Sequence, residues 1–387
     1  MTNRILHLIP TLMSGGAERQ LVNVVGSTSP EDFTHLVCTL NESGFYAPLI
    51  REKGYEVREL GINGKRPWFK AAPKFAEVVR EYEPDLINTW LYDANITGRI
   101  AKLRGSFKTP LVTSLQATDY EPETIRSGNW SPKKVEVLRQ IDKITMRLTQ
   151  PYFVACSKFV QTSFEKRLGI PPKKTRMIYN AVNPESLICG DEAPQKVRQE
   201  LNIPDDAFVY LNIGRLDPQK NQLRLLEAFA RILPSLTNAY LMIVGAGRLE
   251  GELKDLVKTL GIEKNVRLIG RRKDVGACLS AADVFVFPSL FEGLPLALVE
   301  AMFKSLPCIA GDIEVLREVI TDGKDGLLVN PHEISEIAAA MIKLFEQPKL
   351  CRQLGEQALK EVETNFHAKV TAIEWEDFYR QIISEES

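Results

Sequence analysis

Two glutamates stand at a spacing that suits sugar-phosphate chemistry, in the segment F-E-G-L-P-L-A-L-V-E-A-M. Pro295 suits the first turn of a helix, whose unpaired N–H groups, from about Leu296 on, would face an anion. Glu300 lies about 6 Å further along such a helix, at ~1.5 Å per residue, so its carboxylate could hold a sugar diol while a phosphate lies at the helix start. Glu292 lies outside the helix and is left to face a second sugar. A single buried glutamate can also be a structural hydrogen-bond partner, and that alternative stays open here.

Two cations, Arg215 and Lys220, flank a turn in the segment G-R-L-D-P-Q-K-N. Both can reach one phosphate group, the arginine as a planar fork and the lysine as a point charge. Gly15 and Gly16 mark an earlier loop, where backbone N–H groups and a helix start can approach an anion closely. Surface cations and tight turns from strand to helix are common, so each loop by itself only favours an anionic ligand.

A third loop, V-G-A-G-R-L-E-G, has the spacing G-x-G-x-x-x-G. A dinucleotide fingerprint requires G-x-G-x-x-G in the first strand-to-helix turn of its domain, and this loop lies deep in the chain. We therefore expect no redox dinucleotide there. The six cysteines stand singly without any C-x-x-C pair, which favours reduced thiols over a disulfide framework or a cysteine zinc site.

The elements that must position these loops follow from the hydrophobic pattern. Short apolar runs alternate with amphipathic segments of helical period along the whole chain, which is typical of parallel α/β sheets. Strands are predicted at 4–9, 35–39, 85–90, 110–114 and 152–155, and again at 208–213, 240–244, 266–269, 284–287, 308–310 and 326–329. Helices are predicted at 17–25, at 132–148 and from 332 onward, where the last, about 369–383, has Trp375, Phe378, Tyr379 and Ile382 on one packed face. The irregular segment 180–204 predicts an interdomain linker.

The composition bounds the class of protein. With 387 residues, 44% hydrophobic and 26% charged, the chain is expected to be globular, cytoplasmic and divided into two domains. No apolar run approaches the roughly 18 residues that span a bilayer, and the first ten residues suit a strand rather than a signal peptide. The net charge of −1 conceals an asymmetry, because residues 1–190 contain 26 Lys and Arg against 19 Asp and Glu, and residues 191–387 contain 23 against 31. The positive half fits an anionic partner, although solvated helix faces fit the numbers equally well.

Together these segments resemble the retaining glycosyltransferases of family 4. The likeness rests on Gly-Gly-Ala-Glu-Arg after the first strand, on Gly-Arg-Leu with Lys220 and Asn221, on Val-Gly-Ala-Gly, and above all on the two glutamates spaced E-x7-E. It covers nearly the whole chain. The resemblance implies the α/β GT-B fold, with two Rossmann-like doubly wound parallel-sheet domains facing across a cleft. The expected domains are 1–185 for the acceptor, 186–367 for the nucleotide sugar, and 368–387 as a C-terminal helix that packs back on the first domain.

By the same resemblance the C-terminal domain binds a nucleotide-activated sugar. Glu300 is expected to hold the ribose hydroxyls, Arg215 and Lys220 the diphosphate, and Glu292 the hydroxyls of the transferred sugar. Gly16 is expected to close over the phosphates from the other domain, and the segment 270–272 to contact the base. The full set of expected donor contacts adds the glycine-rich loops and the helix start: Gly15, Gly16, Gly245, Arg271, Gly293, Leu294, Leu296 and Ala297.

The implied reaction is glycosyl transfer with retention, in which the leaving diphosphate takes the acceptor's proton on the same face. The sequence contains no D-x-D, so no metal or other cofactor is expected, and Arg215 and Lys220 must offset the diphosphate charge. Many members of the family have a histidine over the donor sugar, where this chain has Gln116. An amide does not titrate, so Gln116 is expected only to hydrogen-bond the sugar, and Asp119 is a candidate for orienting the acceptor. The four histidines, at 7, 35, 332 and 367, lie outside these loops and are expected to be structural.

The acceptor is expected to bind the first domain. Residues 99–176 contain 16 basic and 6 acidic residues, and the predicted helix that follows Trp130 begins with Lys133 and Lys134. Such a surface suits a lipid diphosphate or an anionic membrane. We therefore expect a peripheral enzyme on the inner face of the cell membrane. It would transfer a sugar from a nucleotide diphosphate, uridine in preference to guanosine, to a glycan or lipid-linked acceptor in bacterial-type surface polysaccharide synthesis.

Other functions remain open at this point. The chain could bind a nucleotide sugar without turnover, or transfer the sugar to a soluble small molecule, and phosphorolysis of a glycan is chemically close on the same fold. Nucleic-acid binding is not expected, because the basic half contains no recognised motif and no interleaved aromatic platform.

Overall fold

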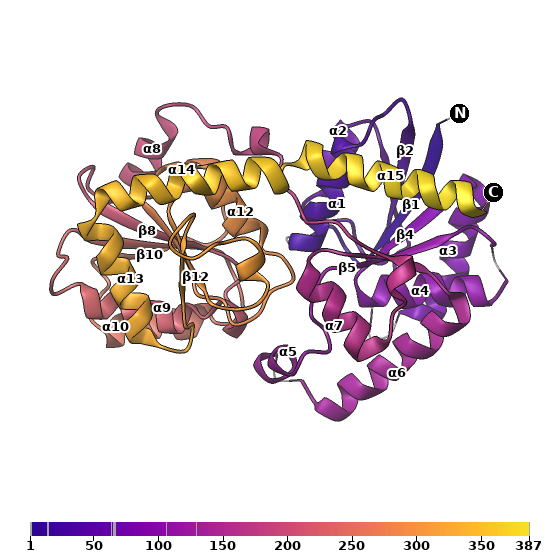
Figure 1. Cartoon of the computed structure of the whole chain (residues 1–387), viewed down its shortest axis with the longest axis horizontal. Coiled ribbons are helices and arrows are strands. Elements are labelled where there is room, and N and C mark those ends of the chain that lie inside the picture. The colour runs from indigo at the N-terminus through magenta and orange to yellow at the C-terminus, as the bar shows by residue number, and fades with distance from the viewer. Residues whose placement is uncertain are drawn as a thin grey trace. The chain divides into compact units, whose positions relative to one another are not determined.

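The computed structural model describes residues 2–13, 15–62, 64, 67–105, 107–128 and 130–386. These divide into two units, each with its own parallel sheet (Figure 1). Unit 1 comprises the described residues of Met1–Ile125, Asn129–Val182 and Ala368–Ser387, and unit 2 those of Arg126–Gly128 and Asn183–His367.

Unit 1 contains a seven-stranded sheet in the order β3-β2-β1-β4-β5-β6-β7, in which every neighbouring pair is parallel. Because parallel strands need crossover connections, the carboxyl ends of all these strands lie at one edge. The strands are β1 (Asn3–Ile9), β2 (Phe33–Thr39), β3 (Glu56–Glu59), β4 (Leu86–Trp90), β5 (Leu111–Leu115), β6 (Tyr152–Ala155) and β7 (Thr175–Met177). The helices between them are α1 (Gly16–Ser27), α2 (Ala47–Glu52), α3 (Trp68–Tyr82), α4 (Tyr92–Leu103), α5 (Pro122–Ser127), α6 (Pro132–Thr149) and α7 (Lys158–Leu168).

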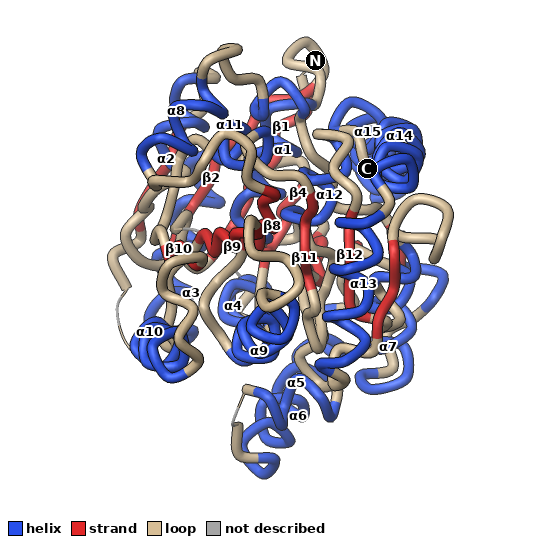
Figure 2. The backbone as a smooth tube through the Cα atoms, turned by 90° about the vertical axis from the view of Figure 1, so that its left-hand side faces the viewer, coloured by secondary structure: helices blue, strands red, loops and turns tan. Residues whose placement is uncertain are grey.

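Unit 2 contains a six-stranded parallel sheet in the order β10-β9-β8-β11-β12-β13, and Figure 2 shows β9, β8, β11 and β12 in this succession. Its strands are β8 (Phe208–Ile213), β9 (Ala239–Val244), β10 (Val266–Leu268), β11 (Val284–Phe287), β12 (Cys308–Gly311) and β13 (Leu327–Val329). Its helices are α8 (Ala193–Glu200), α9 (Gln222–Ile232), α10 (Glu250–Thr259), α11 (Val275–Ser280), α12 (Leu296–Phe303), α13 (Ile334–Glu346) and α14 (Pro348–Asn365). The predicted fold class of two doubly wound parallel α/β sheets is confirmed.

The last helix, α15 (Ala368–Glu386), belongs to unit 1, as the resemblance to the family implied, and its apolar stripe is a packed face, as its spacing predicted. Trp375, Phe378, Tyr379 and Ile382 are all buried in the core beside β1 and β4. The Trp375 ring stacks on Trp90 with 5.6 Å between centroids, and Asn88 Nδ2 donates to the Tyr379 hydroxyl at 2.8 Å. The C-terminal segment is therefore part of the core of unit 1 (yellow in Figure 1).

Three elements were missed in the sequence, each for a physical reason. Strand β3 has the sequence E-V-R-E and β7 has T-R-M, so neither contains the apolar run that marks the central strands. Both lie at the edges of the sheet, where one side of the strand has no partner to pack against. Helix α8 lies inside the segment 180–204 that was predicted to be irregular, and it buries only Val197.

A row of buried polar side chains crosses unit 1 from β4 to α1. Trp90 Nε1 donates to His7 Nδ1 at 3.2 Å, His7 Nε2 lies 3.0 Å from His35 Nδ1, and His35 Nε2 lies 2.8 Å from Thr28 Oγ1. Thr28 in turn donates to the carbonyl of Val24 at 3.1 Å. An indole N–H can only donate, so each following group accepts from the one before and donates to the next. Both imidazoles are therefore neutral, with the proton on Nε2.

Acidification is expected to destabilise unit 1 through this row. Burial lowers the pKa of His35 from 6.5 to about 3, and burial together with His35 lowers the pKa of His7. Below pH 6.5 the unfolded chain therefore binds more protons than the folded chain. For each of the two histidines, the free energy of unfolding falls by up to ~1.4 kcal/mol for every pH unit of acidification. Urea unfolding measured from pH 7 to pH 4 checks this. His35→Asn keeps an acceptor for His7 but takes up no proton, so its profile should be flatter; an equally steep profile would contradict the assignment.

Candidate functional site

The loops after β8 and β11 meet at the carboxyl edge of the sheet in unit 2, because these strands are neighbours. The loop after β8 forms the 3₁₀ turn η3 (Pro218–Lys220) and then passes through Asn221, whose φ is 59°. Asn221 Nδ2 donates to the carbonyls of Pro288 at 3.1 Å and Pro331 at 2.6 Å. One buried amide thus fixes the loops after β8, β11 and β13 against one another.

Lys220 and Glu292 form an ion pair within this group of loops. Lys220 Nζ donates to Glu292 Oε1 at 2.6 Å, and the side chains are only 14% and 7% exposed. The ammonium also lies 4.6 Å from the ring centroid of Phe287, the last residue of β11. Gln219 adds two contacts, accepting from Leu290 N at 2.9 Å and donating to Phe291 O at 2.8 Å. Two residues predicted to bind the same sugar diphosphate are therefore brought into direct contact.

Helix α12 begins at Leu296, with Pro295 as its N-cap, so the first N–H groups of the helix come from Leu296 and Ala297, as predicted. Glu300 lies in the same helix and is 2% exposed. Leu294 is buried and Gly293 is partly exposed in the preceding loop. As predicted, Glu292 is followed along the chain first by the start of α12 and then by the buried carboxylate of Glu300.

The two arginines predicted to bind the donor are less constrained. Arg215 is exposed, and its guanidinium donates to Gln219 Oε1 at 3.3 Å. Arg271 is also exposed. Its neighbour Arg272 is held by ion pairs to Glu200 and Asp274. Gln219 thus connects Arg215 to the loop of Glu292, while the base-binding role of Arg271 stays a prediction.

The glycines of V-G-A-G have a packing role. Gly245 has a φ of 147°, and a Cβ there would lie 1.9 Å from the carbonyl oxygen of Gly214. A Cβ at Gly247 would lie 2.3 Å from the carbonyl oxygen of Leu216. Glycine is therefore required for the loop after β9 to pack against the loop that contains Arg215. This close approach accounts for the G-x-G spacing.

The predicted residues of unit 1 lie in three places. Gly15 is the N-cap of α1 and Gly16 its first residue, and a Cβ at Gly16 would meet no atom within 4 Å. Unit 1 itself therefore does not require glycine at position 16. Gln116 and Asp119 lie in the loop after β5, and both are partly buried. The weakly predicted acceptor residues Trp130, Lys133 and Lys134 are exposed at the start of α6. The donor and acceptor roles of these residues stay predictions.

Several residues of these sites were not predicted. Asn221 was part of the quoted motif, but only its left-handed backbone and its two carbonyl contacts show its role; asparagine is one of the few residues that tolerate such a φ. Phe287 stood only at the end of a predicted core strand. Arg99 was counted with the basic surface of residues 99–176, which is wrong, because the side chain is fully buried and paired with Asp142. No local pattern in the sequence marks that pairing.

Comparison with known proteins gives the family. Residues 194–361 match the family described as Glycosyl transferases group 1, and residues 14–186 match Glycosyltransferase Family 4. An uncharacterized glycosyltransferase of Methanocaldococcus jannaschii is 31% identical over 68% of this chain and 67% of its own length. The chain belongs to glycosyltransferase family 4.

Two further relatives have named activities. The UDP-Gal:alpha-D-GlcNAc-diphosphoundecaprenol alpha-1,3-galactosyltransferase of Escherichia coli is 33% identical over 48% of this chain and 49% of its own. The N-acetylgalactosamine-N,N'-diacetylbacillosaminyl-diphospho-undecaprenol 4-alpha-N-acetylgalactosaminyltransferase of Campylobacter jejuni is 27% identical over 88% of this chain and 90% of its own length. The chain spans about half the length of the first and most of the second.

Solved structures confirm the GT-B fold. HepE of Anabaena, crystallised with UDP and glucose, superimposes with a TM-score of 0.85 over 98% of this chain and 100% of its own, at 22% identity. Among the described residues of this family 4 member, no helix is both long and apolar enough to cross a membrane.

The Lys220–Glu292 pair is expected to be coupled in stability. Removing one member of a buried ion pair leaves an uncompensated charge, which costs ~3 kcal/mol, so Lys220→Ala should lower the free energy of unfolding. Adding Glu292→Gln should recover most of that loss. Denaturant unfolding of the two single variants and the double variant measures the coupling.

The exposed pair Lys254–Glu250, at 2.7 Å, provides the matched control, because its side chains are 55% and 47% exposed. Lys254→Ala should change the unfolding free energy by less than ~1 kcal/mol. If Lys220→Ala is no more costly than this control, the pair does not stabilise the loops.

Proposed function

We propose that this family 4 enzyme transfers a sugar, with retention, from a nucleoside-diphosphate sugar to a glycan or lipid-diphosphate-linked acceptor in the synthesis of a surface polysaccharide. UDP is the proposed carrier. The observation that supports this best is the buried Lys220–Glu292 pair at the strand edge of unit 2, followed by the start of α12. A cation, a carboxylate and free helical N–H groups in one set of loops are the groups that a sugar diphosphate needs.

Each group has a proposed part in the reaction. The bond between the anomeric carbon and the diphosphate breaks, and the acceptor oxygen bonds to the same face of that carbon. The acceptor's proton passes to the leaving phosphate oxygen. Lys220, Arg215 and the N–H groups of Leu296 and Ala297 stabilise the negative charge that develops on the diphosphate. These donors are proposed to offset that charge without a metal.

The two glutamates are proposed to bind hydroxyl groups. Glu292 is held by Lys220 at 2.6 Å and would exchange part of this contact for the hydroxyls of the transferred sugar when the diphosphate attracts the ammonium. Glu300, 2% exposed, would accept from the ribose hydroxyls. A carboxylate that is already buried and oriented loses little side-chain entropy on binding, so the site is preorganised. HepE, which shares the fold, was crystallised with UDP and glucose, and this supports UDP as the carrier.

A lipid-linked acceptor is supported by the names of two relatives, which act on undecaprenol-linked sugars. It is supported independently by the outer surface of α6. Val137, Ile144 and Leu148 are 51%, 56% and 64% exposed, and they lie within about 40° of one another around the helix axis. Trp130, 50% exposed, precedes the helix. Cations flank this apolar stripe: Lys133, Lys134, Lys143 and Arg147. An apolar stripe with basic flanks is typical of helices that lie in the interface of an anionic membrane.

Binding of the donor can be tested by thermal unfolding with a panel of UDP, GDP, ADP and their sugar conjugates. A ligand that binds only the folded chain raises its Tm, and we expect the largest rise with UDP and a UDP-sugar. Lys220→Ala should abolish this rise and lower transfer by at least ~100-fold, while Lys254→Ala should leave both unchanged. Transfer should persist with EDTA.

The outcomes separate the functions. A rise in Tm without transfer or slow donor hydrolysis would favour a protein that only binds nucleotide sugars. No rise with any nucleotide would contradict the proposed donor site.

The membrane face can be tested by sedimentation with vesicles of phosphatidylcholine, with and without phosphatidylglycerol. We expect retention on the anionic vesicles, with a part that resists salt because it comes from apolar contact. Replacing Val137, Ile144 and Leu148 by Ser should remove the salt-resistant part. Replacing Val370 and Ile373 of α15, which are 41% and 61% exposed, by Ser is the matched control and should have no effect. Equal behaviour of the two variants would contradict a role for α6.

A further inference from the structure

The strand order of unit 2 reverses between β8 and β11, since β9 and β10 follow outward from β8 on one side and β12 and β13 from β11 on the other. The register between β8 and β11 covers two pairs, Tyr210–Val284 and Leu211–Phe285, whereas β8 stays paired with β9 as far as Ile213. The two central strands therefore separate toward their carboxyl ends. Ligands of open α/β sheets bind beyond the strand ends at such a point.

Side-chain amides take the place of the backbone ladder where β8 and β11 separate. Asn212 Nδ2 donates to the carbonyl of Val286 at 2.7 Å. Gln222 is the first residue of α9, and its Nε2 lies 3.4 Å from Asn212 Oδ1 and donates to the carbonyl of Arg215 at 3.1 Å. Both amides are fully buried. Because a carbonyl can only accept, the two backbone carbonyls fix which way each amide points. The row thus connects β11 to the turn that begins at Arg215.

The two cations of this turn are held in different ways. The ammonium of Lys220 lies in the ion pair with Glu292, and its stem passes over Gly214, where a Cβ would lie 3.4 Å from Cγ, Cδ and Cε of the lysine. The Arg215 side chain is exposed, and its guanidinium makes a contact of 3.3 Å within its own turn, which is long for a hydrogen bond. The reach of Arg215 therefore depends on where its backbone lies, and Gln222 holds that backbone.

The Gln222 amide fixes this geometry at little gain in stability. Its Oε1 is buried and accepts no hydrogen bond within the part of the chain that the structure describes. A buried acceptor without a partner costs free energy, which offsets what the two contacts of Nε2 contribute. Methionine has a similar length and no such acceptor, so it would avoid that cost but would release the carbonyl of Arg215. The consequence of the amide is therefore the position of the turn.

We propose that Gln222 is a positioning residue for glycosyl transfer, and that it acts by holding the backbone from which Arg215 reaches the leaving diphosphate. This rests on the proposed function, in which Arg215 stabilises the charge that develops on the diphosphate. That charge grows as the bond to the anomeric carbon breaks, so a displaced guanidinium costs more in the transition state than in the bound ground state. Loss of the Gln222 amide therefore lowers kcat more than it changes KM for the donor.

The test compares variants of the full chain that lose a hydrogen bond to a buried carbonyl of unit 2. Gln222→Met and Gln222→Leu differ in shape, but both lack the N–H donor. Tyr210→Phe is the matched control, because the buried Tyr210 hydroxyl donates to the carbonyl of Met341 at 2.9 Å, in α13. Thermal unfolding of each variant shows whether it folds.

Activity is measured as release of UDP from UDP-glucose, UDP-galactose or UDP-N-acetylglucosamine, with N-acetylglucosamine on an alkyl diphosphate as the acceptor. Both Gln222 variants should lower kcat at least ~10-fold, while KM for the donor changes less than ~3-fold. Tyr210→Phe should leave both constants unchanged, even where its Tm is lower. A residue that only stabilised the fold would lower the Tm without this split between kcat and KM.

A cycle with Arg215→Ala tests the route by which Gln222 acts. If Gln222 works through the guanidinium of Arg215, Gln222→Met should lower kcat less than ~2-fold further in a chain that already contains Arg215→Ala. Two positions that act independently would instead give effects that multiply.

The failures are distinct. If the natural chain releases no UDP and no nucleotide raises its Tm, the proposed function itself is wrong. If the natural chain is active, the positioning role is overturned when the Gln222 variants keep the kcat of Tyr210→Phe, or when the effects of Gln222→Met and Arg215→Ala multiply. Failure of both Gln222 variants to fold would also overturn it, because the amide would then be needed for stability.

Discussion

Parallel pairing of the strands is the constraint on which both sites depend. All neighbouring strands in the two sheets are parallel, so each strand must be followed by a crossover, and the loops that open these crossovers gather at one edge. This is why Lys220 and Glu292, 72 residues apart, share a hydrogen bond. It is also why Leu91 and Gln116, which directly follow the neighbouring strands β4 and β5, lie at the same edge of the sheet. A fold with hairpin connections would have distributed the same loops over two edges.

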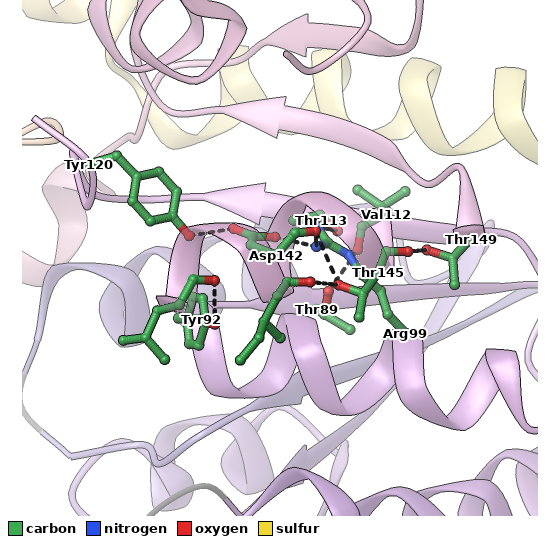
Figure 3. Close-up of polar contacts among 11 residues, drawn as sticks. Thr89, Tyr92, Arg99, Val112, Thr113, Tyr120, Asp142, Thr145 and Thr149 are labelled. Atoms are coloured by element: carbon green, nitrogen blue, oxygen red, sulfur yellow. Dashed lines mark hydrogen bonds and ion pairs between the residues drawn. The ribbon is translucent and has the colours of Figure 1, made fainter. Parts of the chain in front are cut away.

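The loops are rigid because buried polar groups connect them to one another. In unit 2 the amide of Asn221 reaches carbonyls in two other loops, and glycines allow the loop after β9 to pack on that of Arg215. In unit 1 the Arg99–Asp142 ion pair connects α4 to α6, and the Tyr120 hydroxyl connects the loop after β5 to the same aspartate (Figure 3). Such networks contribute little net stability, since each polar group must lose its water, but they impose one geometry. Preorganisation of this kind favours binding of a polar ligand because the loops need little rearrangement.

Most of the fold could be predicted from the sequence, and the reason is burial on both faces. Central strands such as β9 and β11 are continuous apolar runs, whereas β3 and β7 at the edges have no such run and were missed. In the site, local motifs identified Glu292, Glu300 and Lys220, because glycine, proline and charge have local consequences in a turn. The contact between Lys220 and Glu292, and the burial of Arg99, depend on the packing of distant segments, and no periodicity encodes that.

The distribution of charge within unit 1 has a consequence for the acceptor. The half of the sequence that contains most of unit 1 has 26 basic and 19 acidic residues. Four of the cations flank the outer stripe of α6, while Asp119, in the strand-end loop after β5, lies near a second carboxylate, Asp142. A molecule that satisfies both regions must carry negative charge at one end and neutral hydroxyls at the other. Free sugars lack the first and inorganic phosphates lack the second. A sugar on a lipid diphosphate has both, so the charge pattern of unit 1 supports the proposed acceptor, as do the undecaprenol-linked substrates named for two relatives.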